Sequence, residues 1–273
     1  MDRSLSSKCR LILGTILALT AVAFTDAHIS MIYPLPRGHP FNPNTGFVDY
    51  NCRDAPLYDG CGGGLGKTFP CGGYPPDRQV VQSFQAGQVI NVRFGNAQFG
   101  SPGQPQLTPS SNQARHAGGL CEFSLSYDQG KTFGVFARYH GSCPDMYYDW
   151  PVKLPENLPS CDSCIFGWSW INAAATQAEY YMGCADIKIV GKSGGAGGVL
   201  PSEIANTPLR LANMPGHPYY HAPGDQFGNT KSNGPDPAQI EANMHSATGG
   251  PDSSFQAMYN KRKRSTRTRR GGN

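Results

Sequence analysis

Short runs of alternating hydrophobic and polar residues recur along the chain and predict β-strands. The clearest run covers residues 121–127, and a second follows at residues 132–139 after the turn Asp128-Gln129-Gly130, so the two would form a hairpin. Further strands are predicted at residues 29–32, 78–84, 88–94, 165–170 and 179–190, with a turn at Ala86-Gly87 between the second and third of these. Helical periodicity is scarce, so the chain is predicted to form an all-β sandwich.

Alternation also assigns side chains to the faces of the last two strands. In strand 179–190, Tyr181 falls on the same face as Glu179 and the apolar residues further along, so Tyr181 is predicted to point inward. Three aromatic residues share one face of strand 165–170 and are expected to build the core: Phe166, Trp168 and Trp170.

An apolar run of a different kind, residues 11–24, lies near the start of the chain. Basic residues precede it, and small residues follow it at Thr25 and Ala27, the pattern of a cleaved secretory signal. A membrane span needs about 20 apolar residues, so this run is too short to be one. The chain is therefore predicted to be secreted, with no transmembrane segment and with His28 as the first residue of the mature protein.

Composition and charge divide the rest of the chain. With 34 Gly and 23 Pro in 273 residues, long loops are expected, among them residues 145–160, and residues 191–235 are expected to wrap the sandwich. The tail at 261–270 carries seven positive charges, whereas residues 28–260 have a net charge of −4, so the charge gives no reason to expect a nucleic-acid partner. The predicted organisation is a signal peptide (1–27), a β-sandwich (28–235) and a disordered basic C-terminal tail (236–273).

Eight cysteines follow the predicted signal, an even number that indicates disulfides in a secreted chain. They are Cys52, Cys61, Cys71, Cys121, Cys143, Cys161, Cys164 and Cys184. Their connectivity stays open, because eight cysteines allow 105 pairings. Cys161-x-x-Cys164 would suit a redox or zinc site in a cytosolic protein, but without a second such motif a structural role is predicted.

An N-terminal histidine has unusual metal chemistry. The α-amine and ring Nδ1 of His28 lie close enough to bind one metal in a chelate ring. One further imidazole would complete a planar site of three nitrogens, which favours copper. By itself, His116 in its glycine-rich loop would be a solvent-exposed histidine.

Four segments together resemble one protein family. They are His28-Ile-Ser-Met-Ile-Tyr-Pro-Leu-Pro, Phe69-Pro-Cys71, His116-Ala-Gly-Gly-Leu-Cys121 with the strand that follows it, and the closing strands Phe166-Gly-Trp-Ser-Trp-Ile-Asn172 and Glu179-Tyr-Tyr-Met-Gly-Cys184. In this order they resemble fungal lytic polysaccharide monooxygenases, most closely auxiliary activity family eleven. The resemblance covers residues 28–190. It departs from the family at Ile29, Gly183 and residues 173–176, so the substrate stays open.

The resemblance implies an immunoglobulin-like or fibronectin-III-like β-sandwich with a histidine brace. One copper per chain would be bound by the amine and ring of His28, by His116 and, axially, by Tyr181. Glu179 would lie beside the metal and act in catalysis with these residues, because a carboxylate can orient an oxygen species or relay a proton. Tyr33 is a candidate for the substrate-facing surface.

The implied reaction is the oxidative cleavage of insoluble β-1,4-linked polysaccharide, with chitin favoured over cellulose. An external electron donor and O2 or H2O2 would be co-substrates, and the extracellular enzyme is expected to be a monomer. Two alternatives remain open: a non-catalytic secreted copper-binding protein, and a polysaccharide- or cell-wall-binding module in which the Trp and Tyr residues stack on sugars. Mass spectrometry of products formed with polysaccharide and reductant would distinguish them.

Overall fold

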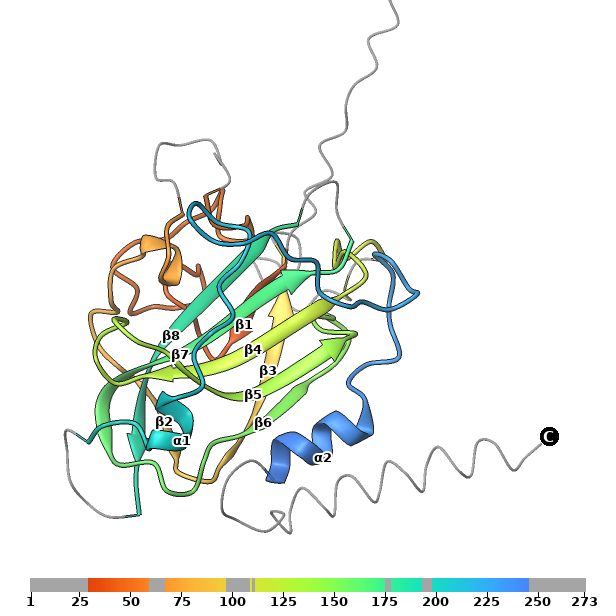
Figure 1. The fold of residues 1–273 in the computed structure, drawn as a ribbon. Coiled ribbons are helices and arrows are strands. Elements are labelled where there is room, and N and C mark those ends of the chain that lie inside the picture. Colours follow the sequence, from red (N-terminus) through yellow and green to blue (C-terminus); the bar gives the residue numbers. More distant parts are fainter. Residues whose placement is uncertain are drawn as a thin grey trace, which may run out of the picture.

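In the computed structural model, the described residues are 29–58, 67–96, 109, 111–174, 178–192 and 198–245. They form a sandwich of two β-sheets (Figure 1). The smaller sheet has the order β1 (Ser30–Tyr33), β3 (Val89–Gly95), β6 (Trp150–Lys153). The larger has the order β2 (Gln82–Gln85), β8 (Tyr180–Val190), β7 (Cys161–Asn172), β4 (Gly119–Ser126), β5 (Gly134–Gly141). The predicted all-β sandwich is confirmed.

The main core lies between the two sheets. It contains the inward-facing aromatic residues of β7 and also Tyr181, as the alternation predicted. Ile29 and Met31 contribute from the smaller sheet, and both are fully buried. Burial of large aromatic side chains removes much apolar surface from water, which is the main stabilising term in folding.

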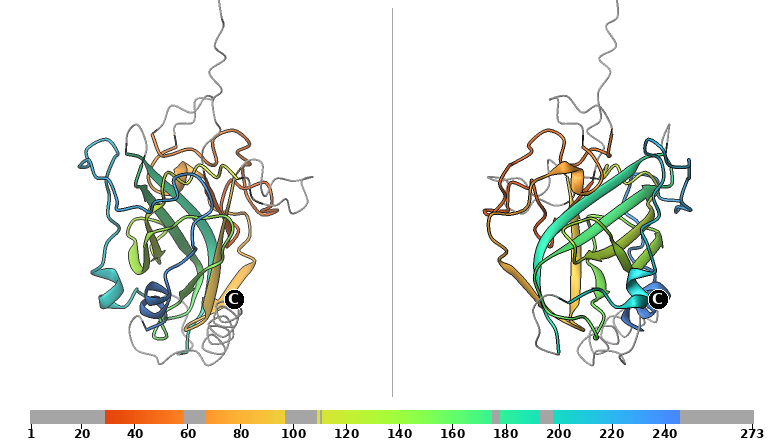
Figure 2. Two further views of the ribbon diagram at one scale, coloured as in Figure 1. Left: turned by 90° about the vertical axis from the view of Figure 1, so that its right-hand side faces the viewer. Right: turned by 60° about the vertical axis from the view of Figure 1, so that its left-hand side comes forward.

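A second core covers the outer face of the larger sheet. Residues of β4, β7 and β8 with the opposite orientation pack there against Leu209, Ala212 and Met214, so β4 is buried along its whole length. In Figure 2 (left), residues 200–215 (teal) lie on one side of the green strands and β3 (yellow) lies on the other. The described part of 191–235 therefore covers the sandwich as predicted.

Two predictions about the strands need correction. Strand β2 begins only at Gln82, and β2 and β3 belong to different sheets: β2 pairs with β8 in parallel, whereas β3 pairs with β1 and β6. Residues 145–160 are not only loop, because they contain β6. Its Pro151 obscured this strand in the sequence, but a proline is tolerated here because β6 lies at the edge of its sheet.

The predicted start of the disordered tail is also wrong. Residues Pro237–His245 form helix α2, whose Ile240 and Met244 are buried in the main core. The side chain of Asp236 accepts a hydrogen bond from Ala238 N–H at 2.7 Å and so caps the helix. A second, shorter helix, α1, spans Ser202–Ala205. The tail after residue 245 and the predicted signal peptide lie outside the described residues.

Disulfides join the loops to the sheet. Cys71, in the short 3-10 helix η1 (Cys71–Gly73), is bonded to Cys184 of β8. Two more bonds are Cys121–Cys143, which joins β4 to the loop after β5, and Cys161–Cys164 within β7. Cys52 is disulfide-bonded as well. Cys161 and Cys164 are thus bonded to each other, and the structural role predicted for their motif stays a prediction. No helix among the described residues is long and apolar enough to cross a membrane.

Candidate metal centre

The backbone around His116 has a shape that glycine makes possible. Gly118 and Gly119 follow it at the start of β4, and a Cβ atom at Gly118 would lie 1.8 Å from a carbonyl oxygen of β5. At Gly119 a Cβ would lie 2.1 Å from the carbonyl oxygen of Ile171. Any larger residue would therefore force the strands apart, which explains the sequence His-Ala-Gly-Gly.

The His116 imidazole lies in a partly enclosed position. Its ring is stacked near Trp170, with centroids 5.9 Å apart and an interplanar angle of 22°. The indole N–H of Trp170 donates to the carbonyl oxygen of Gly118 at 3.1 Å, which fixes the indole against the same loop. His116 Nε2 lies 3.6 Å from Glu179 Oε2, and each of these side chains is about one-sixth exposed, at 16% and 17%.

The Glu179 carboxylate is the polar centre of the site. Its Oε2 accepts hydrogen bonds from the Tyr181 hydroxyl and from Asn172 Nδ2, both at 2.7 Å. Asn172 in turn accepts the backbone N–H of Glu179 at 3.0 Å. Asn172 is fully buried and Tyr181 is 1% exposed, so both hydrogen bonds are held in fixed geometry.

Tyr181 is fixed by stacking as well. Its ring lies 4.4 Å from that of Trp170 at an interplanar angle of 28°, because the two residues are direct partners in the β7–β8 pairing. Sequence reasoning assigned Trp170 only to the core and gave Asn172 no role at the site. Their i,i+2 spacing places Trp170 and Asn172 on one face of β7, but only the register with β8 brings that face to Tyr181 and Glu179.

The N-terminal strand approaches this site from the other sheet. His28 lies outside the described residues, but Ile29 is fully buried and lines a cavity of about 20 Å³ together with Trp168 and Tyr181. Ser30 is held to Asp54 by a hydrogen bond of 2.5 Å between its hydroxyl and Oδ1. The start of β1 is therefore fixed next to the residues around Tyr181.

A buried charged cluster supports the start of β1. Asp54 also pairs with the guanidinium of Arg53 at 2.9 Å. The ammonium of Lys67 donates to the carbonyl oxygens of Arg53 and Ala55 at 2.8 and 2.6 Å. Burial lowers the pKa of Lys67 from 10.5 to about 8, although Asp54 and Asp49 act in the opposite direction.

Tyr33, at the end of β1, packs against the larger sheet. Its ring packs 6.4 Å from that of Phe84, and Phe84 pairs with Ile189. Ile189 lies eight residues along β8 from Tyr181, which is about 26 Å at the rise of a β-strand. A role for Tyr33 in the substrate-facing surface stays a prediction.

The donor atoms at the site fit a copper ion only in part. Among the described residues, no group of three or more His, Cys, Asp or Glu side chains could hold a metal. The site provides one imidazole, that of His116, with a phenol and a carboxylate beside it. Imidazole nitrogens suit copper, and a further nitrogen ligand is needed to complete the site. The predicted source of that nitrogen, His28, directly precedes the buried Ile29.

Comparison with known proteins gives one informative relative. No protein-family model matches the chain. The chain is 31% identical over 204 residues, which are 73% of its length and 80% of the other, to an Aspergillus fumigatus protein named "AA11 family lytic polysaccharide monooxygenase A".

Similar solved structures include the extended catalytic domain of H. jecorina LPMO9A. It is 17% identical, with 67% of this chain and 73% of that chain covered and a TM-score of 0.35. A cellulose-active polysaccharide monooxygenase from M. thermophila is 16% identical, with 66% and 81% covered and a TM-score of 0.38. Likenesses this weak carry no argument about activity.

Proposed function

Because this chain belongs to the AA11 family of lytic polysaccharide monooxygenases, we propose that it cleaves crystalline chitin with copper held by His28 and His116. Membership of this family identifies the chain as an oxidoreductase that cleaves polysaccharide with the help of copper. The proposal adds the ligands, the substrate and the site of action. It also takes residues 1–27 as a signal peptide, so that the mature extracellular chain begins at His28.

The observation that carries the proposal is the set of polar contacts around Glu179. One carboxylate oxygen accepts both the Tyr181 hydroxyl and the Asn172 amide at 2.7 Å and lies 3.6 Å from His116 Nε2. The family resemblance implies that Glu179 and Tyr181 lie together beside the metal, and the carboxylate lies between the Tyr181 phenol and the His116 imidazole as that arrangement requires. A purely structural glutamate would not need to be next to a partly exposed histidine.

The residues have distinct roles in this proposal. His116 and the amine and ring of His28 would hold the metal, and the Tyr181 hydroxyl would lie beside it. Bound copper would supply the one-electron chemistry that activates O2 or H2O2 after reduction by an external donor. Trp170 stacks on both His116 and Tyr181 and so limits their rotation. Glu179 Oε2 accepts the Tyr181 hydroxyl in a hydrogen bond and would be the atom that takes up or releases a proton at this site.

The test is the product pattern. The secreted protein is incubated with chitin or with cellulose, a reductant and H2O2, and soluble products are analysed by mass spectrometry. Oxidised chitin oligosaccharides that disappear in His116→Ala support the proposal, and oxidised products from cellulose alone would replace chitin as the substrate. Copper binding without any oxidised product would identify a non-catalytic copper protein. Binding to polysaccharide without copper binding would identify a binding module.

A further inference from the structure

A segment far along the chain holds the loop that carries His116. We name residues 113–118 the histidine loop and residues 225–232 the C-terminal loop. We propose that the C-terminal loop is a positioning element for the metal site and that Asn229 is its main contact with His116. This inference rests on the proposed copper-binding role of His116.

The contact with His116 is direct. Its backbone N–H donates to the side-chain oxygen Oδ1 of Asn229 at 2.8 Å. On its other side, the carbonyl oxygen of His116 accepts the N–H of Ala174 at 2.8 Å. Both backbone groups of the histidine are thus bonded to segments that are distant in sequence. The position of the imidazole depends on these partners because the ring is attached to the backbone between them.

Further bonds join the two loops along their length. Gln113 N–H donates to the carbonyl oxygen of Asn229, and Ala117 N–H donates to that of Gly228, both at 2.9 Å. In the opposite direction, Asp225 N–H donates to the carbonyl oxygen of Ala117 at 2.8 Å. The C-terminal loop therefore forms backbone hydrogen bonds with the histidine loop as a neighbouring β-strand would.

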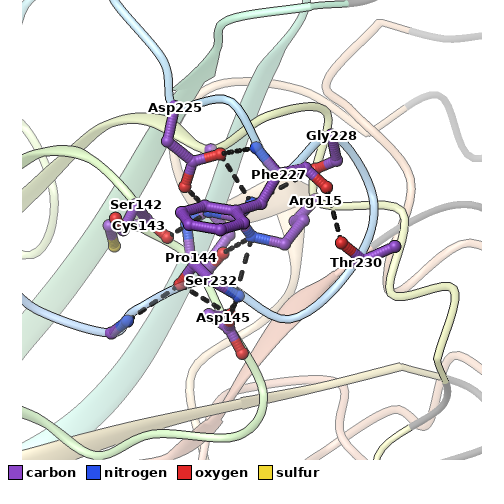
Figure 3. A network of polar contacts seen from close by, with 12 residues as sticks. Arg115, Ser142, Cys143, Pro144, Asp145, Asp225, Phe227, Gly228, Thr230 and Ser232 are labelled. Atoms are coloured by element: carbon purple, nitrogen blue, oxygen red, sulfur yellow. Dashed lines mark hydrogen bonds and ion pairs between the residues drawn. The ribbon is translucent and has the colours of Figure 1, made fainter.

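The buried side chain of Arg115 stabilises the contact between the two loops (Figure 3). Its side chain is fully buried, and its two terminal nitrogens donate to the two carboxylate oxygens of Asp225 at 3.0 and 2.6 Å. It also donates to the carbonyl oxygens of Ser142 and Pro144 at 2.7 and 3.1 Å. Such a bidentate pair fixes orientation as well as distance. Arg115 directly precedes His116, so the anchored arginine also fixes the position of the His116 backbone nitrogen.

The end of the C-terminal loop is anchored next to the same place. The Asp145 carboxylate is fully buried and accepts both the N–H and the hydroxyl of Ser232, at 2.7 and 2.8 Å. Asp145 follows Pro144, whose carbonyl oxygen binds Arg115. The loop is therefore held at both ends, and Asn229 lies between these anchors.

The histidine loop needs such support because its backbone is strained. Ala114, His116 and Ala117 have φ angles of 55°, 48° and 59°, the left-handed region that residues with a Cβ atom avoid. Each such residue is held there by its surroundings rather than by its own preference. If the bond from Asn229 is lost, the backbone at His116 is free to relax, and the direction of its imidazole changes.

The test measures the metal site rather than turnover. Secreted protein that begins at His28 is compared with Asn229→Ala, Asn229→Asp and Thr230→Ala. Asn229→Asp keeps the acceptor oxygen. Thr230→Ala is the matched control, because Thr230 is exposed on the same loop and its hydroxyl donates to the carbonyl oxygen of Phe227 rather than to the histidine loop. Cu(II) spectra are recorded by electron paramagnetic resonance, and copper Kd is measured by competition with a chelator.

We expect an altered Cu(II) spectrum and a copper Kd raised about tenfold in Asn229→Ala. Asn229→Asp should restore both, and Thr230→Ala should match the wild type. Identical spectra and Kd in Asn229→Ala and wild type would overturn the inference, as would equal changes in Thr230→Ala. If Asn229→Ala does not fold, Asn229→Gln, which displaces the acceptor by one methylene, takes its place with the same expected shift. A wild-type protein that binds no copper would instead refute the proposed function and remove the premise.

Discussion

Lys67 makes the stability of the fold depend on pH in a defined window. Its ammonium is buried below the start of β1, and burial lowers its pKa from 10.5 to about 8. Because the folded pKa is the lower one, the unfolded chain binds more protons between these two values. The free energy of unfolding therefore rises as the pH is raised from about 8 towards 10.5, and this stabilisation is absent below pH 8.

The size of the effect follows from the two pKa values. One pKa unit corresponds to about 1.4 kcal/mol, so pKa values of about 8 and 10.5 give a gain of about 2 kcal/mol between pH 8 and pH 10. The window ends near pH 10 because burial raises the pKa of four tyrosines above their usual value of 10.0, and each then lowers stability at higher pH. They are Tyr74, Tyr127, Tyr139 and Tyr180.

The assay is urea unfolding at pH 8, 9 and 10, followed by tryptophan fluorescence, for the wild type and Lys67→Met. The difference between the two proteins removes the contribution of groups that both share. We expect the wild type to gain about 2 kcal/mol relative to the variant across this range. Parallel pH curves would refute the reasoning, because they would mean that Lys67 titrates alike in the folded and unfolded chains.

The remaining predictions concern acid stability and the site. Burial lowers the pKa of His39 from 6.5 to about 3, so stability should fall by about 4 kcal/mol as the pH drops from 6.5 to 3, and His39→Asn should reduce this slope in acid-unfolding curves. Tyr181→Phe should still bind copper and fold. Glu179→Gln should lower the rate of product formation by about 100-fold or more, with a smaller loss of copper affinity. An unchanged rate in Glu179→Gln would contradict the proton-transfer role of Glu179. Gly118→Ala should lower Tm and copper affinity together, since its Cβ would meet a carbonyl oxygen of β5 at 1.8 Å; an unchanged Tm would contradict the close contact.

Local patterns predicted the larger sheet well. The strands β4, β5, β7 and β8 alternate clearly, because their inward positions all face the main core. Strand β6 was missed because Pro151 is a poor strand former that is tolerated at an edge. Helix α2 was missed because only two apolar side chains anchor it, in a sequence rich in polar residues and glycine.

The site could be predicted as far as chain order and resemblance reach. His116, Glu179 and Tyr181 lie together as expected, since Glu179 and Tyr181 share one strand face. The roles of Trp170 and Asn172 depend on the register between β7 and β8, which single-strand patterns do not contain. The support from Asn229 could not be predicted, because a hydrogen bond across 113 residues leaves no local signal.

The central claim is that one copper is held by His28 and His116. The measurement that tests it most directly is a copper titration of protein whose first residue is His28, beside a form with one extra N-terminal residue and beside His116→Ala. We predict one tightly bound copper, with affinity that falls as the pH drops, because the α-amine binds only when deprotonated and its free pKa is about 8. Both altered proteins should lose most of this affinity. Unchanged copper binding in His116→Ala, or in the form with the blocked amine, would contradict the account.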